Sequence, residues 1–583
     1  MKALLSGNEA IARGAFEADC AVATAYPGTP STEILETIVS RYPEITSAWS
    51  VNEKTALETA YGASMAGGRS IVCMKHVGLN VAADPLFTAA YSGVKRGLVI
   101  VTADDPSMHS SQDEQDNRLY GKFAKIPVLE PSDSQEAKEF TKQGFTLSEE
   151  FDTPVILRTT TLISHTQTVV NLEEPQRQPT TYQFEFADAK FVNLPTFARQ
   201  HHQQVEERLQ RLSRYNSESS FNRIETRSDE VGIITCGLAY QYVRESFPEA
   251  SVLKIGMVFP LPMDLIRKFA AQVAKLYIIE ELEPFLEEPI RAAGIPVAMG
   301  KDRIPICFEL SVDILRRIAT DETVPEVIKP PLPPRPPVLC PGCPHRGVYF
   351  SLNKNKVTVN GDIGCYTLGF MPPLSSVHTC ICMGASITNA NGFEIIKQRA
   401  GQHPQTVATI GDSTFMHSGI TGLLDAVYNK IPTTVIILNN DITAMTGHQP
   451  NPVSGMTAGR QSAPKLDLVS LCHSLGIRRV DKVNPYDLKE FQSVLNDHLN
   501  LMEPSVIITN QPCILLPQVK STRYFRIESD ICKRCKQCLK LGCPAISFQD
   551  NRVSIDTVSC SGCSLCAQVC PFGAIKEVSR ESS

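Results

Sequence analysis

Short apolar runs alternate with amphipathic stretches along most of the chain. In the first 170 residues, 70–74 and 98–102 are continuous apolar runs of strand length, and the alanine-rich stretch 55–66 precedes the first of them. Continuous apolar runs bounded by polar turns indicate strands buried on both faces, and the stretch 55–66 is typical of a helix. The pattern predicts βα units around a parallel sheet.

The same alternation occurs twice more, over strand-length runs at 232–235, 251–255 and 275–279 and again at 406–410, 434–438 and 505–509. From about residue 167 to 230 the chain becomes polar, and residues 330–337, between the last two sets of runs, read PPLPPRPP. A proline run of this kind favours a stiff extended spacer. The sequence therefore predicts a multidomain α/β protein with a boundary near residue 330.

Composition excludes several classes of protein. The chain has 583 residues, 42% of them hydrophobic, and a net charge of −6 without long runs of one sign. This balance argues against a basic nucleic-acid-binding face, and no run of about 18 apolar residues predicts a membrane span. Polar residues from Gly7 onward interrupt any signal-peptide core. We expect a cytoplasmic protein that binds neither nucleic acid nor membrane.

Cysteine is the most informative residue type. Of 19 cysteines, eight lie between Cys532 and Cys570. Disulfides are a poor explanation in a large chain without a secretion signal, so the crowding points to metal or redox chemistry. The last sixty or so residues therefore read as a separate cysteine module.

The spacing in this module is that of a bacterial-type ferredoxin with two [4Fe–4S] clusters. Three close cysteines hold one cluster, and the fourth of each run, followed by proline, reaches the other cluster. The predicted ligand sets are Cys532, Cys535, Cys538 and Cys570 for one cluster and Cys560, Cys563, Cys566 and Cys543 for the other. The first run carries one extra residue before its last cysteine. The alternative is two structural zinc sites, which usually pair their cysteines instead.

The third α/β segment carries a candidate metal site. Gly411, Asp412 and Ser413 follow one predicted strand, and Asn440 follows the next, 28 positions after Asp412. This is the pattern of thiamine diphosphate and Mg²⁺ sites, in which Asp412, Asn440 and the main-chain carbonyl of Ile442 supply hard oxygen ligands. Ser413 stands where glycine is usual. The alternative is an ordinary βαβ unit with an asparagine-rich turn.

Two features of the first segment complete the pattern. Glu53 stands where a strand gives way to a helix, as required of a glutamate that protonates the thiamine aminopyrimidine, although a solvated helix-start glutamate is an alternative. The turn containing Thr29, Pro30 and Ser31 offers hydroxyls and amides suited to a substrate carboxylate.

In combination these motifs resemble the 2-oxoacid:ferredoxin oxidoreductase family. The resemblance rests on 26–33 (YPGTPSTE), 52–54 (NEK), 340–346 (CPGCPHR) and Gly411-Asp412 with Asn439-Asn440, followed by the ferredoxin module, and it covers residues 1 to about 578. It is strongest for large subunits that act on aryl pyruvates. It implies thiamine diphosphate, Mg²⁺, a small beta subunit as partner, ferredoxin as electron acceptor, and coenzyme A and a 2-oxo acid as substrates.

The resemblance also implies a third [4Fe–4S] cluster close to thiamine. Its ligands would be Cys340, Cys343, Cys365 and Cys513, with Cys380 and Cys382 as competitors for one position. A zinc clip or inert thiols are the alternatives for the first pair. Five other cysteines are expected to be buried packing residues: Cys20, Cys73, Cys236, Cys307 and Cys472.

Several further residues are candidates for the cofactor or substrate site. His345 and Arg346 could contact the diphosphate or cap a helix, Thr446 could contact the diphosphate, and Met445 could support the bent cofactor or belong to the core. The loop 109–118 follows a predicted strand, so Gln112, Asp116 or Arg118 could meet a ligand, with a solvated loop as the alternative.

The resemblance assigns a role to each predicted domain: 1–170, thiamine pyrimidine binding; 171–229, a polar helical connector; 230–325, a transketolase C-terminal-like α/β domain; 326–338, a proline-rich linker; 339–516, thiamine diphosphate and Mg²⁺ binding; and 521–583, an α+β ferredoxin-type domain. The implied reaction is oxidative decarboxylation of an aryl pyruvate to aryl-acetyl-CoA and CO₂. Three alternatives remain: a related enzyme for another 2-oxo acid, a non-oxidative thiamine decarboxylase, and an electron carrier with an inactive thiamine fold.

Overall fold

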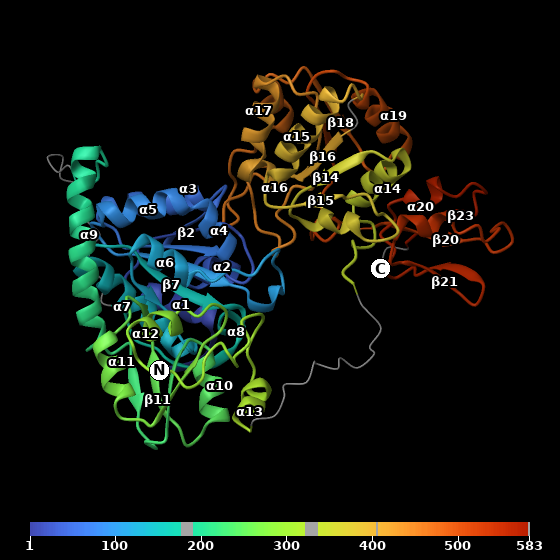
Figure 1. The fold of residues 1–583 in the computed structure, drawn as a ribbon. Helices are drawn as coiled ribbons and strands as arrows, with labels where there is room; N and C mark the ends of the chain where they lie inside the picture. The colour runs from blue at the N-terminus through green and yellow to red at the C-terminus, as the bar shows by residue number, and fades with distance from the viewer. Residues whose placement is uncertain (176–189, 321–335, 404–405, 520, 581–583) are drawn as a thin grey trace. The chain divides into compact units, whose positions relative to one another are not determined.

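The chain forms two compact units, Met1–Pro330 and Pro331–Ser583, in a computed structural model that describes residues 1–175, 190–320, 336–403, 406–519 and 521–580 (Figure 1). Both units contain parallel sheets with helices, so the predicted multidomain α/β class is confirmed. None of the described helices is long and apolar enough to cross a membrane.

The first unit is organised around a seven-stranded sheet. In spatial order its strands are β12 (Met257–Phe259), β6 (Val128–Leu129), β7 (Val155–Thr160), β5 (Leu98–Asp104), β4 (Ser70–Lys75), β2 (Val22–Ala25) and β3 (Thr46–Trp49). All neighbours are parallel except β12, which pairs antiparallel with β6. A separate antiparallel pair joins β1 (Lys2–Ser6) to β8 (Gln167–Asn171). The apolar runs at 70–74 and 98–102 are thus the central strands β4 and β5.

Helices cover both faces of this sheet, as expected for strands buried on both sides. They are α1 (Gly7–Glu17), α2 (Thr32–Arg41), α3 (Glu53–Met65), α4 (His76–Val81), α5 (Ala83–Ser92), α6 (Arg118–Ala124), α7 (Ser134–Phe151) and α8 (Thr161–His165). Apolar residues of α1, α2 and α7 share one core, and those of α3 and α5 share the other.

The second α/β segment belongs to the same unit. Its four-stranded sheet has the order β13 (Lys275–Ile279), β10 (Val231–Cys236), β11 (Ser251–Ile255) and β9 (Arg223–Glu225), with helices α10 (Ala239–Ser246), α11 (Met263–Ala270), α12 (Glu287–Ala292) and α13 (Val312–Ala319). Ile234, Leu253 and Phe269 join the same core as α3 and α5. The two sheets therefore share one hydrophobic core.

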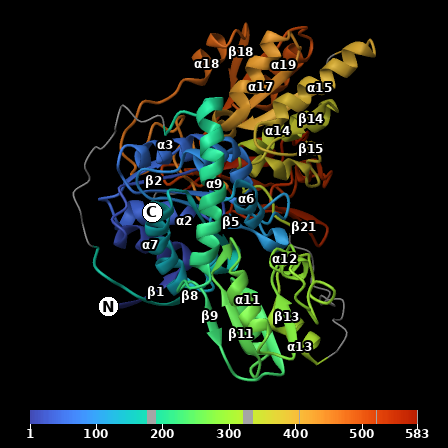
Figure 2. The same ribbon diagram turned by 60° about the vertical axis from the view of Figure 1, so that its left-hand side comes forward.

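The described part of the predicted polar connector contains one long helix, α9 (Pro195–Asn216; Figure 2). This helix contacts α5. Its inward face buries Val205, Arg208 and Leu212. Arg208 donates hydrogen bonds to the carbonyl oxygens of Asp152 and Ala90. This helix is therefore packed against the unit, while residues 176–189 of the same segment lie outside the described residues.

The second unit contains a six-stranded parallel sheet with the order β15 (Thr379–Cys380), β14 (Thr358–Gly361), β16 (Thr406–Gly411), β17 (Thr434–Asn439), β19 (Ser505–Asn510) and β18 (Arg479–Val483). One face packs against α14 (His345–Asn355) and α19 (Leu488–Leu499), and the other against α15 (Ala385–Arg399), α17 (Ile420–Tyr428) and α18 (Leu468–Ser474). Residues 321–335, which include most of the predicted proline-rich linker, lie outside the described residues.

The cysteine module at the end of the chain has two antiparallel strand pairs, β20 (Arg523–Ile527) with β23 (Ile575–Ser579) and β21 (Ile546–Gln549) with β22 (Arg552–Ile555), and a short helix α20 (Leu565–Gln568). Its core includes Phe350 of α14 and Tyr486 of the loop before α19. The module therefore packs against the six-stranded sheet domain through side-chain contacts, in addition to its covalent connection.

Candidate active site

The predicted metal ligands lie at one edge of the six-stranded sheet. Gly411 pairs with Leu438 in the parallel register of β16 and β17, so Asp412 and Asn440 leave neighbouring strands at the same edge. The helix that starts at Asp412 continues through a π-helical turn, Phe415–Gly419, a feature frequent at functional sites.

Asp412 fits the role of a metal ligand. It is 2% exposed, and its Oδ1 accepts a hydrogen bond from the Ser413 amide at 2.8 Å. Its Oδ2 is buried and has no hydrogen-bond partner among the residues that the structure describes. Burial raises the pKa of Asp412 to about 7. A divalent cation would provide the missing partner and stabilise the ionised carboxylate, so the residue suits Mg²⁺.

The turn after β17 presents the remaining predicted oxygen ligands. Asn440 is buried, and its Oδ1 accepts a hydrogen bond from the Ile442 amide at 3.3 Å. The hydroxyl of Ser413 accepts a hydrogen bond from Thr443 at 2.9 Å, so serine at this position connects the two loops. Met445 is about half exposed and Thr446 donates to Gln449, so their predicted cofactor contacts stay predictions.

His345 lies behind the strand end that carries Gly411. A Cβ added to Gly411 would lie 2.6 Å from the ring of Tyr366, so glycine is needed for this close approach. Tyr366 in turn packs edge-on against His345, with 5.8 Å between ring centroids. Burial lowers the pKa of His345 to about 4. Its imidazole is therefore neutral, and its predicted contact with a diphosphate could involve a hydrogen bond but no positive charge.

The four cysteines of the predicted third cluster are electrostatic neighbours. Burial raises the pKa of the Cys343 thiol to about 12, and the nearby Cys365 and Cys340 add to this effect. Burial likewise raises the pKa of Cys365 to about 11, with contributions from Cys513 and Cys340. Such thiols lose their protons when iron binds them, so the group is suited to a metal cluster.

This cysteine group adjoins the candidate metal site. The Cys513 amide donates a hydrogen bond to the carbonyl oxygen of Asn440 at 3.0 Å. Asp412 also contributes to the raised pKa of Cys513, after burial and Cys340. The competitor Cys382 is exposed, and its electrostatic neighbours are Asp362 and Cys380.

The ferredoxin-type cysteines line two cavities, divided as their spacing predicts. One cavity is lined by Cys532, Cys535, Cys538 and Cys570. The other is lined by Cys543, Cys560, Cys563 and Cys566. Backbone amides of Phe525 and Ala574 donate hydrogen bonds to Cys560 and Cys570 at 3.4 and 3.3 Å. Such bonds to cluster sulfur tune reduction potentials, so both cavities suit [4Fe–4S] clusters. No group of three His, Cys, Asp or Glu side chains in the described ranges could hold a single metal ion.

Arg346 connects the cavity of Cys543 to the inner cysteine loop. It is almost fully buried and donates to the carbonyl oxygens of Leu541 at 2.7 Å and Cys340 at 3.1 Å. Arg346 also lines this cavity together with Gly342. These contacts indicate a structural role between two cysteine groups, and the contact of Arg346 with the diphosphate stays a prediction.

We expect Arg346→Leu to destabilise this junction. The substitution leaves buried carbonyl oxygens without donors, which should cost about 3 kcal/mol and lower the melting temperature by roughly 5–10 °C. Differential scanning calorimetry of the cluster-loaded protein measures the change. Arg478→Leu, which removes an exposed arginine paired with Glu503, is the matched control and should leave the melting temperature unchanged. Equal melting temperatures for the two variants would contradict this role.

In the first unit, Glu53 is the first residue of α3 and is 5% exposed. Asn52 caps this helix by accepting a hydrogen bond from the Thr55 amide at 2.8 Å. A Cβ on Gly78 of α4 would lie 2.6 Å from Glu53 Oε1, so the carboxyl group is packed against that backbone. The alternative of a solvated glutamate is therefore wrong. Glu53 belongs to the first unit and Asp412 to the second.

The predicted substrate turn lies at the carboxyl end of β2. Ser31 is buried and donates its hydroxyl hydrogen to the Gly28 carbonyl at 2.9 Å. Pro30 is buried as well, and its carbonyl accepts a hydrogen bond from Asn8 at 2.7 Å. Ser31 and Pro30 therefore shape the turn, and Thr29 is the member of the three with partly exposed surface.

Two residues of the loop 109–118 are structural. Arg118 is fully buried and forms ion pairs with Asp116 and with Glu280, the latter at 2.9 Å. The expectation of a ligand contact or a solvated loop is wrong for these two residues, whereas Gln112 is exposed. The prediction of buried packing holds for four of the five isolated cysteines, but Cys307 is exposed.

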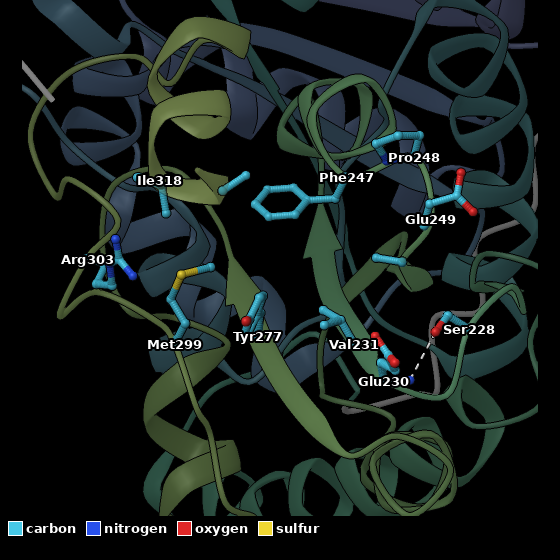
Figure 3. A pocket seen from close by; sticks show the side chains of 12 residues that line it. Ser228, Glu230, Val231, Phe247, Pro248, Glu249, Tyr277, Met299, Arg303 and Ile318 are labelled. Atoms are coloured by element: carbon cyan, nitrogen blue, oxygen red, sulfur yellow. Dashed lines mark hydrogen bonds between the residues drawn. The ribbon is translucent and has the colours of Figure 1, made fainter. Parts of the chain in front are cut away.

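A cavity of about 420 Å³ in the four-stranded sheet domain contains none of the predicted site residues (Figure 3). It is lined by Val231 at the start of β10 and Ala250 just before β11, with Phe247 and Tyr277 in its wall. Ligands of open α/β sheets bind at the opposite, carboxyl ends of the strands. We therefore assign this cavity no part in the active site.

Family models match three separate segments of the chain. Residues 13–231 match the family "Pyruvate flavodoxin/ferredoxin oxidoreductase, thiamine diP-bdg", 362–509 match "Thiamine pyrophosphate enzyme, C-terminal TPP binding domain", and 553–576 match "4Fe-4S binding domain". A solved structure of 2-oxoglutarate:ferredoxin oxidoreductase from Magnetococcus marinus is 18% identical, with a TM-score of 0.45 over 55% of this chain and 65% of that one.

The similarity to two curated proteins extends over almost the whole chain. Indolepyruvate oxidoreductase subunit IorA of Archaeoglobus fulgidus is 41% identical and covers 99% of this chain and 97% of its own length. The protein of the same name from Thermococcus kodakarensis is 40% identical with the same coverage. The chain belongs to the IorA family. The predicted resemblance to 2-oxoacid:ferredoxin oxidoreductases is thereby confirmed.

In this IorA-family chain, three residues that lie close to predicted site residues were not identified from the sequence. Lys75 ends β4 beside the substrate turn, Asp362 accepts hydrogen bonds from the amides of Gly384 and Ser386, and Tyr486 donates to the Gly342 carbonyl. A charged residue directly after the apolar run 70–74 could have indicated Lys75. The partners of Asp362 and Tyr486 are distant in sequence, so no local signal identifies these two.

Proposed function

We propose that the chain is the thiamine- and cluster-binding subunit of an enzyme that oxidatively decarboxylates aryl pyruvates of the indolepyruvate type. The products are aryl-acetyl-CoA and CO₂, and ferredoxin accepts the electrons. The names of the relatives matched over nearly their full length support the substrate class. A small beta subunit completes the enzyme, coenzyme A accepts the acyl group, and the reaction takes place in the cytoplasm.

The observation that best supports an oxidative reaction is the hydrogen bond from the Cys513 amide to the Asn440 carbonyl at 3.0 Å. It joins the candidate Mg²⁺ site to the inner cysteine group. A non-oxidative decarboxylase needs no redox centre at this place, whereas an enzyme that removes electrons from its substrate does. An inactive thiamine fold is disfavoured because the buried Oδ2 of Asp412 has no hydrogen-bond partner in the described part of the chain.

Different residues of the chain are proposed to bind the metal and to handle the proton. Bound thiamine diphosphate would supply an electron sink next to the substrate carboxylate, and the clusters would carry single electrons. Asp412, Asn440 and the Ile442 carbonyl would hold Mg²⁺, which would help to bind the diphosphate. Glu53 would hold a proton at the aminopyrimidine N1′, and its burial would limit the access of water.

The order of the clusters follows from the cavity linings. Gly342, between the inner cysteines Cys340 and Cys343, also lines the cavity of Cys560. The cluster held by Cys543, Cys560, Cys563 and Cys566 is therefore the second in the proposed relay. Cys535, which is exposed, belongs to the outermost cluster of the proposed relay, from which electrons would leave to ferredoxin.

Steady-state assays of the complex with its beta subunit test the proposal. Indolepyruvate or phenylpyruvate with coenzyme A should reduce two one-electron ferredoxins for each CO₂ and acyl-CoA formed. Aldehyde release without ferredoxin reduction would establish the non-oxidative decarboxylase instead. A higher kcat/KM for pyruvate or 2-oxoglutarate would overturn the substrate class.

The Mg²⁺ assignment has its own test. Asp412→Ala removes the buried carboxylate, so we expect Mg²⁺-dependent retention of thiamine diphosphate to fall by about 100-fold or more. Cofactor bound after gel filtration, with iron content as a reference, measures the loss. Asp441→Asn is the matched control, because Asp441 has a positive φ of 60° that asparagine tolerates and its carboxylate pairs with Lys465. Full retention in Asp412→Ala would remove this residue from the metal site.

A further inference from the structure

We infer that Lys75 binds the carboxylate of the 2-oxo acid substrate. The inference rests on the proposed function and extends it, because it assigns the group that recognises the acid. It concerns the carboxyl edge of the seven-stranded sheet, where the substrate turn and Glu53 also lie.

The position of Lys75 is that of a ligand-binding residue. Lys75 is the last residue of β4, which lies between β2 and β5 in the sheet. The turn containing Thr29 follows β2, and Asp105 follows β5. Three loops therefore meet around Lys75 at the sheet edge where open α/β folds bind their ligands. Glu53 packs against Gly78 in α4, the helix that begins directly after Lys75.

Contacts hold the lysine side chain against the substrate turn. A Cβ added to Gly28 would lie 3.0 Å from the Cβ of Lys75, so the stem of Lys75 runs close over this glycine. The Lys75 ammonium donates a hydrogen bond to the Ser110 carbonyl at 2.7 Å. The Ser110 hydroxyl donates to the Thr29 carbonyl at 3.4 Å. These contacts place the cation beside Thr29, the partly exposed residue of the turn.

The charge of Lys75 has no direct carboxylate partner among the residues that the structure describes. Asp105 is the nearest candidate, but its carboxylate accepts hydrogen bonds from Ser110, Ser111 and Thr161. Asp113 pairs with His76 at 3.4 Å. Burial lowers the pKa of Lys75 to about 8, and the two aspartates oppose this shift. A partly buried, unpaired ammonium favours the arrival of an anion.

The ammonium group also has unused hydrogen-bonding capacity. A protonated lysine has three donors. The Ser110 carbonyl accepts a hydrogen bond from the ammonium at 2.7 Å and the Ser110 hydroxyl accepts a long one at 3.5 Å. Charge-assisted hydrogen bonds to a carboxylate are the strong ones. The coenzyme A phosphates are the other anions of the proposed reaction, and the experiment separates them from the 2-oxo acid.

The experiment uses the holoenzyme with its beta subunit and compares Lys75→Met, Lys75→Arg and a control, Lys125→Met. Lys125 lies at the surface of the same unit and pairs with Glu206. The unreactive probe 3-phenyllactate carries the carboxylate without the keto group, and 2-phenylethanol lacks the carboxylate. Calorimetry gives the Kd of phenyllactate, and inhibition gives the affinity for phenylethanol.

For Lys75→Met we expect the phenyllactate Kd and the phenylpyruvate KM to rise about 10- to 100-fold. Phenylethanol inhibition, the KM for coenzyme A and thiamine content should stay unchanged, and Lys75→Arg should retain most of the affinity. An unchanged phenyllactate Kd would overturn the inference, as would a loss confined to coenzyme A or thiamine. Failure of the proposed function would be recognised separately, because the wild-type enzyme would then not reduce ferredoxin with aryl pyruvates.

A measurement on the wild type keeps the inference testable if Lys75→Met does not fold. Phenyllactate is ionised throughout the alkaline range, so its binding should weaken as pH rises above 8 and Lys75 loses its proton. The charged or titratable groups around Lys75 are Asp105, Asp113, His76 and Glu53. A Kd that is constant between pH 7 and 10 would exclude Lys75.

Discussion

Glu53→Gln should retain thiamine diphosphate while losing turnover by roughly 10²- to 10⁴-fold, the range for removal of a general acid–base group. Glutamine keeps the size of the side chain and its packing against Gly78, but it cannot transfer a proton to the aminopyrimidine. Because Glu53 is 5% exposed, water is poorly placed to replace it. Ferredoxin reduction measures turnover, and cofactor analysis measures retention.

Glu58→Gln provides the matched control on the same helix. Glu58 is exposed and pairs with Lys54, so its replacement should leave both turnover and cofactor content unchanged. Near-normal turnover in Glu53→Gln would remove Glu53 from the mechanism. Loss of the cofactor in the same variant would assign it a binding role only.

Cys513→Ala should remove one of three clusters and stop electron transfer to ferredoxin. At four irons per cubane, iron content should fall from about twelve to about eight per chain. The substitution acts next to the candidate metal site, because the Cys513 amide donates to Asn440. That backbone bond persists in alanine, so thiamine should stay bound. Iron analysis, cofactor analysis and ferredoxin reduction on one preparation measure all three effects.

The control for this substitution is Cys472→Ala. Cys472 is a fully buried packing cysteine of α18, so its loss should leave twelve irons in place. Twelve irons in Cys513→Ala would exclude Cys513 as a ligand and make Cys380 the next residue to test. Eight irons in the wild type would show that the third cluster does not exist.

Sequence patterns predicted the strands and the cysteine sets because both depend on local spacing. The runs at 232–235 and 434–438 are buried strands. A continuous apolar run of this length, bounded by polar turns, is typical of such a strand. The two ferredoxin cavities contain the predicted cysteines because a cubane fixes the number of residues between its ligands.

Contacts between residues that are far apart in the sequence could not be predicted from local spacing. Arg118 is buried because Glu280, 162 positions later, supplies a carboxylate at 2.9 Å. Its position after an apolar strand had suggested a ligand-facing loop. Lys75 is the opposite case: its position after a strand can be read from the sequence, but not that it has no direct carboxylate partner among the described residues. In both cases the role of the residue depends on which charges pair over long distances in the sequence. A single sequence does not reveal these pairs.

The antiparallel strand β12 has a consequence for how this protein can be divided. Residues 257–259 cover the outer edge of β6, and the core of α3 and α5 continues into the four-stranded sheet. A fragment that ends near residue 170 would expose the unpaired edge of β6 and an apolar surface, both of which promote aggregation between copies. A soluble fragment, or a natural gene fusion that borrows this half, therefore has to continue to about residue 320.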